Sequence, residues 1–212
     1  MNEYLQTIYD AILNGEKAET VEAVKAALSA GQEPGVILSD GMIAAMKEVG
    51  KRFEEGDFYV PEMLISARSM QSGLSILKPE LQRSNVKAAG KVAIGTVKGD
   101  LHDIGKNLVG MMLEGSGFEV IDLGTDVDPD KFVSTAREQL PDIIALSALL
   151  TTTMPMMEKT IGALKAAGLR QNVKVIIGGA PVNQAFAEQI GADGYSPDAS
   201  RAASLAQTLI GV

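Results

Sequence analysis

Apolar side chains recur at three- and four-residue steps through the first part of the chain. This spacing puts them on one face of a helix, so it predicts amphipathic helices. Turn-forming glycine and proline residues interrupt the pattern at Gly15, at 31–35 and at 56–61, which leaves four helices with short connections. Such helices predict a small antiparallel bundle. The apolar positions are Leu5, Ile8 and Ile12; Val21, Val24 and Leu28; Leu38, Met42, Met46, Val49 and Phe53; and Met63, Ala67, Met70, Leu74 and Leu77.

The helical periodicity lapses between Gln82 and Gly90, where polar and small residues predict a linker. Short β-branched runs follow, separated by helical patterns. Parallel strands need crossover helices, so this alternation predicts an α/β domain of the Rossmann-like (flavodoxin-like) type, with a doubly wound five-stranded parallel sheet. We expect a four-helix bundle over residues 1–83 and this domain over 90–212. The expected strands are Lys91 to Val97, Phe118 to Leu123, Ile143 to Ser147, Val173 to Ile177 and a weaker one near Gly194 and Tyr195, with a last helix from Asp198 to Ile210.

The composition is that of a soluble globular protein, with 46% hydrophobic and 22% charged residues among 212. No apolar run approaches the roughly 20 residues of a membrane span, and the start of the chain lacks the basic and apolar regions of a secretory signal. We therefore expect a cytoplasmic protein without a membrane partner. The formal net charge of −8 disfavours binding to nucleic acid phosphates.

The inventory of metal-binding side chains is small. The chain has no cysteine and one histidine, His102. Disulfides, thiolate catalysis, cysteine-based metal sites and clusters of several histidine ligands are therefore excluded. A zinc enzyme or a multi-histidine phosphohydrolase cannot be built from these residues.

Unusual residues gather in three loops that each follow an expected strand. In doubly wound sheets, ligands bind beyond the carboxyl ends of the strands, where the strand order reverses. The loops after the first, third and fourth strands are therefore expected to converge. They read Thr96-Val97-Lys98-Gly99-Asp100-Leu101-His102-Asp103-Ile104-Gly105-Lys106-Asn107, Ser147-Ala148-Leu149-Leu150-Thr151-Thr152-Thr153 and Gly178-Gly179-Ala180-Pro181.

These loops carry Asp-x-His-x-x-Gly, then Ser-x-Leu, then Gly-Gly, and together they resemble the signature of B12-binding domains. A lone Asp-x-His-x-x-Gly is a weak signal, whereas three spaced motifs behind a helical bundle are a specific one. Over its whole length the chain is similar to the small corrinoid proteins of methyltransferase systems. It is also similar to the matching module of cobalamin-dependent methionine synthase.

The resemblance implies that His102 is an axial ligand of the cobalt in a cobalamin or related corrinoid. A neutral imidazole suits this role, and its other ring nitrogen needs an acceptor that fixes its tautomer and orientation. Asp100, two residues before His102, is placed to be that acceptor. In the family a hydroxyl residue extends this ligand relay, and the matching position here is Thr153, where several relatives carry serine.

The resemblance also implies a slot in the α/β domain for the nucleotide tail of the cofactor. Small residues would let the tail approach the backbone, and hydroxyl groups would hydrogen-bond to it. In the family the helical bundle covers the upper face of the corrin. Besides the relay, the implied contacts in the α/β domain are Leu101, Asp103, Ile104, Gly105, Ser147, Leu149, Thr151, Gly178, Gly179, Ala180 and Tyr195, with Asp198 near the mouth of the slot. In the bundle they are Val60 and Met63.

Each of these residues also has a purely structural interpretation. Gly105 can permit close helix packing, and Gly178 with Gly179 can form a tight turn. Ser147 and the threonines 151–153 suit the N-cap of a helix that starts near Pro155. Met63 can be core filler, as methionines often are. Lys98 and Lys106 flank the histidine loop, and we interpret them as solvated surface lysines.

The function that the resemblance implies is that of a corrinoid methyl carrier. It would accept a methyl group on cobalt from a substrate-specific methyltransferase and deliver it to a second methyltransferase, whose acceptor is of the coenzyme M or tetrahydrofolate type. A reductive activase is a further expected partner, and the chain would be a subunit of a methyltransferase system rather than a stand-alone enzyme. The alternatives are a B12-dependent sensor or regulatory module, a subunit of a radical mutase, and a flavodoxin-like domain that binds a phosphate ligand.

Overall fold

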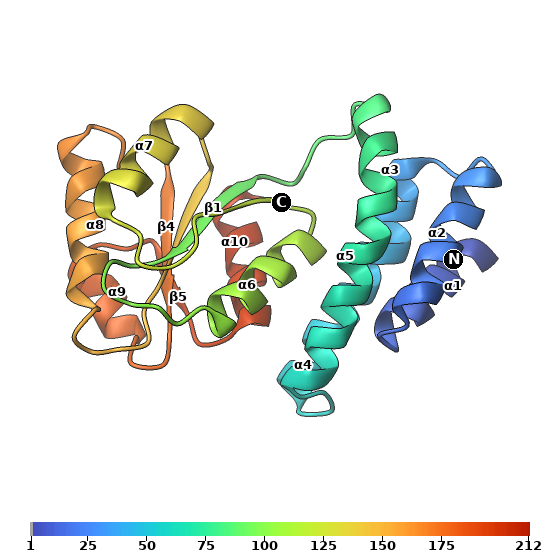
Figure 1. Ribbon diagram of the computed structural model, residues 1–212, viewed down its shortest axis with the longest axis horizontal. Coiled ribbons are helices and arrows are strands. Elements are labelled where there is room, and N and C mark those ends of the chain that lie inside the picture. Colours follow the sequence, from blue (N-terminus) through green and yellow to red (C-terminus); the bar gives the residue numbers. More distant parts are fainter. Residues whose placement is uncertain (1) are drawn as a thin grey trace. The chain divides into compact units, whose positions relative to one another are not determined.

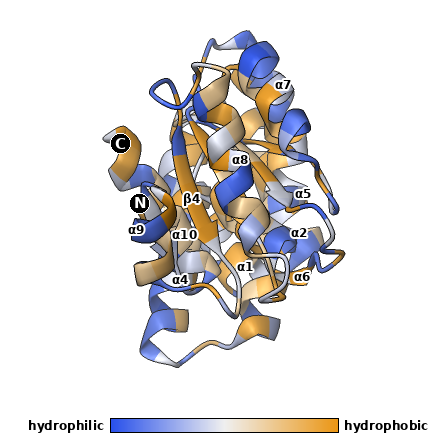
Figure 2. Cartoon of the chain, turned by 90° about the vertical axis from the view of Figure 1, so that its left-hand side faces the viewer, coloured by the Kyte–Doolittle hydropathy of each residue, from blue (hydrophilic) through white to orange (hydrophobic). Residues whose placement is uncertain are grey.

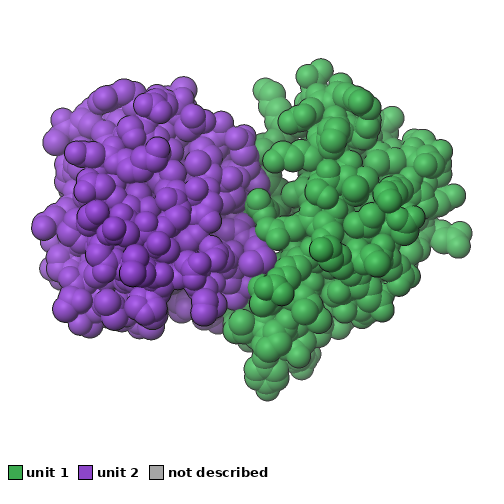
Figure 3. Space-filling view, in the orientation of Figure 1, with its two compact units in different colours: residues 1–88, 114–117 green, residues 89–113, 118–212 purple. Residues whose placement is uncertain are grey.

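The computed structural model of the protein describes residues 2–212, which form two compact units. One unit contains the chain up to Ala88 together with Glu114–Gly117, and the other contains Ala89–Leu113 and Phe118–Val212 (Figure 3). No helix within the described residues is both long enough and apolar enough to cross a membrane.

The first unit is built from four helical stretches, as the periodicity predicts. They are α1 (Glu3–Leu13), α2 (Lys17–Ser29), a third stretch of three consecutive segments, and α5 (Val60–Arg83). The side chains at the predicted apolar positions fill the interior: Ile8, Ile12, Met42, Met63 and Met70 are all fully buried. The predicted four-helix bundle is therefore confirmed.

The third helical stretch has a feature that the sequence pattern does not reveal. It starts as α3 (Pro34–Val36), continues as a π-helical segment η1 (Ile37–Ile43), and ends as α4 (Ala44–Glu55). Within η1, a Cβ added at Gly41 would lie 3.4 Å from the Ile8 side chain. A Cβ at this distance would make an ordinary van der Waals contact, so the packing of η1 against α1 does not require glycine here.

The second unit contains a five-stranded sheet whose strands are all parallel, as predicted. Its order is β2-β1-β3-β4-β5. The observed bounds differ from the expected ones by one residue at most, because burial alone does not mark where pairing ends. The strands are β1 (Lys91–Thr96), β2 (Glu119–Asp122), β3 (Ile143–Ser147), β4 (Lys174–Gly178) and β5 (Gly194–Ser196).

Helices cover both faces of the sheet (Figure 1). They are α6 (Ile104–Gly115), α7 (Pro129–Gln139), α8 (Pro155–Ala166), α9 (Gln184–Ile190) and α10 (Ala199–Ile210). Helices α7 and α8 lie on one face, and α6 and α10 on the other. Under α7 and α8, the buried side chains of Phe132, Met157 and Ile161 pack against Ile144 and Ile177 of the sheet. Most of β4 is hydrophobic (Figure 2), as expected for a strand buried on both faces.

The strand order fixes where a ligand can bind. From β1 the chain passes to the edge strand β2 and then returns to β3 on the other side of β1, so the order reverses between β1 and β3. The loops that leave these two strands diverge there and open a crevice at the carboxyl edge. The loop after β4 leaves the next strand along the same edge.

Candidate functional site

Asp100 lies in the loop after β1 and is completely buried, although it is a carboxylate. Five hydrogen-bond donors surround it. Oδ1 accepts from the backbone N–H of His102 (3.1 Å) and lies 2.7 Å from His102 Nδ1. Oδ2 accepts from the Thr153 hydroxyl (2.8 Å) and from the backbone N–H groups of Leu149 (2.7 Å) and Leu150 (3.3 Å). Asp100 thus joins the loop after β1 to the loop after β3.

These contacts decide the protonation of both side chains. Burial alone would raise the pKa of Asp100, but the hydrogen bonds from His102, Leu149 and Thr153 hold that pKa well below its usual value. Asp100 is therefore ionised near neutral pH and acts only as an acceptor. The hydrogen between the two groups is then on His102 Nδ1, so the neutral imidazole has its lone pair on Nε2.

His102 Nε2 is available to an external ligand. Within residues 2–212 this nitrogen has no hydrogen-bond partner, and the His102 side chain is 51% exposed. An imidazole whose Nδ1–H is held by a carboxylate is the usual arrangement of a metal ligand. The chain has no second histidine and no cysteine, so further nitrogen ligands have to come from the metal's own cofactor. The residues therefore fit a metal that is carried by a macrocycle.

Large apolar side chains on the same two loops are exposed to solvent. The exposed fractions are 73% for Leu101 and 82% for Ile104, on either side of His102, and Leu149 and Leu150 after β3 are also exposed. Exposed apolar groups that cluster beside a polar centre indicate a ligand surface. These four residues suit the apolar face of a flat ring.

The three glycines of the expected nucleotide slot have different surroundings. A Cβ added at Gly105 would meet no atom within 4 Å, so the space next to this residue is open. At Gly178 the nearest atom would be the Ser196 carbonyl oxygen at 3.2 Å. Gly179 has φ +131°, and a Cβ there would lie 1.8 Å from the Ala148 carbonyl oxygen. The chain's own packing therefore requires Gly179, whereas nothing in the chain occupies the space at Gly105.

The remaining predicted site residues are distributed as follows. Ser147 ends β3 between Thr96 and Gly178, and Thr151 and Ala180 are exposed on their loops. Asp103 accepts a hydrogen bond from the Asn107 side chain. Tyr195 of β5 pairs with Ile177 of β4 and packs against the hydrophobic core. In the helical unit, Met63 is fully buried, whereas Val60 is 47% exposed at the start of α5. The roles of these residues stay predictions.

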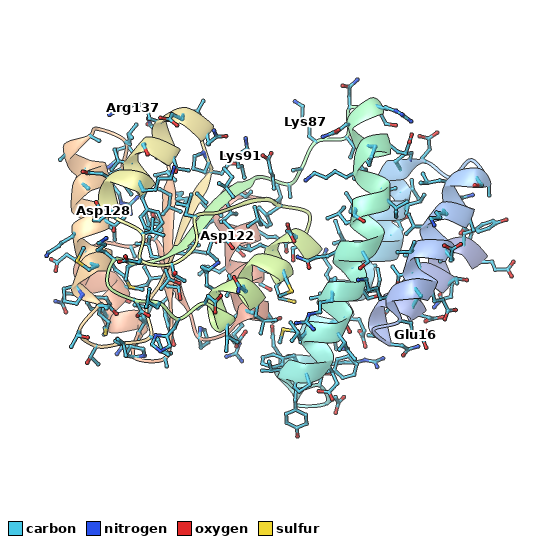
Figure 4. All side chains as sticks on the ribbon, in the orientation of Figure 1. Glu16, Lys87, Lys91, Asp122, Asp128 and Arg137 are labelled. Carbon is cyan, nitrogen blue, oxygen red and sulfur yellow. The ribbon has the colours of Figure 1, made fainter. Side chains whose placement is uncertain are left out.

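Two structural interpretations of the sequence are wrong. Lys106 is not a solvated lysine: it is 3% exposed, and its Nζ bonds both oxygens of Asp122 at 2.6 Å (Asp122 is labelled in Figure 4). Because Asp122 ends β2, this pair ties the start of α6 to the sheet. Threonines 151–153 do not cap α8, whose N-cap is Met154, because Thr153 bonds to Asp100 instead. Asp198 is the N-cap of α10, because its side chain accepts the Arg201 N–H. Its expected place near the mouth of the nucleotide slot stays a prediction.

A segment that the sequence reasoning missed also borders the site. It follows β2 and runs beside the histidine loop, where Val97 pairs with Val127. Within the histidine loop itself, the buried Thr96 hydroxyl donates to the His102 carbonyl oxygen at 2.8 Å. The Gly124-Thr125-Asp126 turn after β2 is the sequence signal that marks this segment, because glycine and aspartate tolerate left-handed backbone conformations.

The fold and the site together define a doubly wound domain in which one oriented imidazole lies in the loop after β1, next to the switch point of the sheet. Comparisons with known proteins specify the family. The sequence profile of the B12 binding domain matches residues 90–204, and a second profile with the same description matches residues 4–78. The chain belongs to the family of B12-binding corrinoid proteins, and its cofactor is a cobalamin or related corrinoid.

Individual relatives agree with this assignment. Dimethylamine corrinoid protein 2 of Methanosarcina acetivorans is 44% identical over 209 residues, which cover 98% of this chain and 96% of that protein. Trimethylamine corrinoid protein 1 of the same organism is 42% identical over 203 residues, with 95% and 94% covered. Among solved structures, the methanol:cobalamin methyltransferase complex of Methanosarcina barkeri matches with a TM-score of 0.87 at 31% identity, covering 99% of this chain and 80% of that one.

Proposed function

We propose that this protein is a methyl carrier that works between two methyltransferases. When bound, the corrinoid supplies the cobalt that takes up the methyl group and gives it up again. The observation that carries the proposal is the half-exposed His102 side chain, whose Nδ1 is held by the buried and ionised Asp100 and whose Nε2 has no hydrogen-bond partner within residues 2–212. The relatives whose names refer to methylamines and to methanol methyltransferase support the same class of function.

The residues of the relay have separate tasks in this proposal. His102 would ligate the metal through Nε2, and Asp100 keeps its Nδ1–H in place. Thr153 has one hydroxyl hydrogen, with both Asp100 Oδ2 (2.8 Å) and the Leu150 carbonyl oxygen (2.9 Å) within reach. It can therefore turn away from the carboxylate when Asp100 binds a proton. Through this hydroxyl, the relay adjusts how strongly His102 donates to the metal.

Other residues hold and cover the cofactor. The apolar side chains of Leu101, Ile104 and Leu149 support the ring. The open space beside Gly105 admits the nucleotide tail, with Ser147, Thr151, Gly178, Gly179, Ala180 and Tyr195 along the proposed slot. Asp103 holds the histidine loop through Asn107. In this proposal the helical domain, residues 1–83, would cover the reactive face through the exposed Val60, whereas Met63 is buried in the helical unit and would have to become exposed to take part.

The partners follow from the chemistry of the transfer. A substrate-specific methyltransferase activates the donor, and a methylated amine or methanol fits the relatives named above. A second methyltransferase passes the group to a thiol of the coenzyme M type or to a tetrahydrofolate. Occasional oxidation of the metal calls for a reductive activase.

Reconstitution tests this proposal. The protein is loaded with cobalamin, reduced, and mixed with a methylamine or methanol methyltransferase and its substrate. We expect the absorption spectrum to change to that of the methylated cofactor, and a second methyltransferase with coenzyme M or tetrahydrofolate to reverse the change. A loaded protein that accepts no methyl group with any of these donors would refute the carrier function.

The His102→Ala variant is the companion measurement. It removes the ligand without burying a new group, since the histidine side chain is half-exposed. We expect it to bind corrinoid while losing the absorption spectrum of the histidine-ligated form. An unchanged spectrum would exclude His102 as the ligand.

A further inference from the structure

The segment after β2 is hydrogen-bonded to the first part of the histidine loop, from Thr96 to Asp100. The Thr96 N–H donates to the Gly124 carbonyl oxygen (3.0 Å), and the Val127 N–H donates to the Thr96 carbonyl oxygen (2.9 Å). Further along, the Asp126 N–H donates to the Asp100 carbonyl oxygen (2.9 Å). The histidine loop is thus held from the β2 side as well as from the β3 side.

The Asp126 side chain contacts the turn of the histidine loop that runs from Val97 to Asp100. Its Oδ1 accepts the Gly99 N–H at 2.8 Å, and the same hydrogen bond lowers the pKa of Asp126. Gly99 has φ +81°, and Asp126 itself has φ +54°, an uncommon left-handed conformation for a residue other than glycine. Such conformations persist where surrounding contacts impose them. Asp126 therefore bonds to the turn through both its backbone and its side chain.

We propose that Asp126 is a positioning residue for the metal ligand. Its carboxylate holds the Gly99 N–H, which fixes the turn from Val97 to Asp100 and, through Asp100, the direction of His102 Nε2. This inference rests on the proposed role of His102 as the ligand. Through Asp126, the segment after β2 would then influence how strongly His102 binds the metal.

The hydrogen-bond acceptor, and not the negative charge, carries this effect. Asp126 forms one ion pair within residues 2–212, with Lys98 at 3.4 Å, and both side chains are nearly half-exposed. Exposed ion pairs of this kind contribute little. The Gly99 N–H, in contrast, is bonded at a short distance to a single oxygen.

Three variants separate these contributions. Asp126→Gly removes the acceptor and still permits a positive φ. Asp126→Asn keeps an oxygen that can accept the Gly99 N–H but removes the charge. Lys98→Met removes the ion pair and leaves the acceptor in place.

Two readouts are measured for each variant. In the cofactor-free protein, hydrogen exchange of the Gly99 amide should rise about tenfold in Asp126→Gly and stay near wild type in the other two variants. In the cobalamin-loaded protein, the ratio of histidine-ligated to unligated spectrum should fall about 2- to 10-fold in Asp126→Gly only, the equivalent of one hydrogen bond. Denaturant unfolding of each variant separates this effect from a general loss of stability.

Specific results would overturn the inference. A wild-type spectral ratio in folded Asp126→Gly, or an equal loss in Asp126→Asn, would exclude the acceptor role. If Asp126→Gly does not fold, Asp126→Ala replaces it under the same criteria. If the wild type shows no histidine ligation at all, the proposed function fails, whereas the Gly99 exchange still reports whether Asp126 holds the turn.

Discussion

At the scale of single residues, Asp100 determines what His102 can do. A buried carboxylate is costly unless donors surround it. Asp100 has five donors from two loops, so it stays ionised and places the hydrogen on His102 Nδ1. In the neutral imidazole the lone pair is then on Nε2 of the half-exposed His102 side chain.

In the described part of the chain, two side chains donate hydrogen bonds to Asp100: the His102 ring and the Thr153 hydroxyl. Replacing Thr153 therefore tests the relay. Thr153→Val keeps the shape of the side chain and removes the hydroxyl. We expect the free energy of unfolding to fall by about 1–3 kcal/mol, because a buried charge loses a donor. The histidine-ligated fraction of the loaded protein should fall as well.

Thr153→Ser is the matched control, since it keeps the hydroxyl. Urea unfolding and the absorption spectrum should show it close to wild type. If valine and serine gave the same spectrum, the hydroxyl would have no part in ligation.

The lowered pKa of Asp100 gives a prediction about acid stability. The unfolded chain has the ordinary aspartate pKa of about 4, so between this value and the lower folded pKa the unfolded state binds more protons. The contribution of Asp100 is therefore complete above about pH 4 and is lost as the pH falls toward the folded pKa. Asp100→Asn lacks this contribution, so its unfolding free energy should depend less steeply on pH below about 4.

Unfolding of the cofactor-free protein at a series of acidic pH values measures this difference. Equal slopes for the wild type and Asp100→Asn would mean that the carboxylate titrates normally in the folded protein.

Residue types and spacing predicted part of this site. The motif singled out Asp100, His102 and Thr153, and the geometry brings all three together. The burial of Lys106 could not be predicted, because Lys106 lies on α6, whereas its partner Asp122 ends β2, 16 positions further along the chain. Asp126 likewise acts through contacts that exist only once β1 and β2 pair.

At the scale of elements, the strand order brings the loops after β1, β3 and β4 to one edge. Periodicity predicted the strands and helices well, because the central strands β1, β3 and β4 are mostly buried and the long helices bury one face. It could not predict η1: the predicted apolar positions Leu38 and Met42 follow α-helical spacing, whereas the residues buried in this segment are Ile37, Gly41 and Met42, because the wider turns of a π-helix shift the buried face. Nor could it distinguish Gly105 from Gly179, whose surroundings depend on tertiary contacts.

These two glycines give opposite predictions for substitution by alanine. Gly179→Ala should destabilise the fold by about 3 kcal/mol or more, because its Cβ would overlap the Ala148 carbonyl oxygen at an unfavourable φ. Gly105→Ala should leave the stability unchanged or raise it by up to about 1 kcal/mol, because alanine favours the helix and meets no atom. It should nevertheless weaken corrinoid binding by narrowing the slot.

Thermal unfolding and cobalamin titration measure both effects. Wild-type corrinoid affinity in Gly105→Ala would contradict a nucleotide slot next to this residue. A stable Gly179→Ala would contradict the close approach of the loops after β3 and β4.

At the scale of the whole molecule, the two compact units match two B12-binding profiles. All residues that bond to Asp100 belong to the α/β unit, so this unit contains the complete relay. The assignment of cofactor cover to the helical domain stays a prediction. The net charge of −8 is consistent with partners that are proteins and small molecules rather than nucleic acids.

The single histidine makes the central claim directly measurable. Protein grown with isotopically labelled histidine nitrogen carries that label at His102 alone, while every nitrogen of the added cobalamin stays unlabelled. We predict that the electron paramagnetic resonance spectrum of the cobalt(II) form shows nitrogen splitting that changes with the label, because His102 Nε2 is bonded to the metal. Splitting that stays the same in labelled and unlabelled protein would contradict histidine ligation.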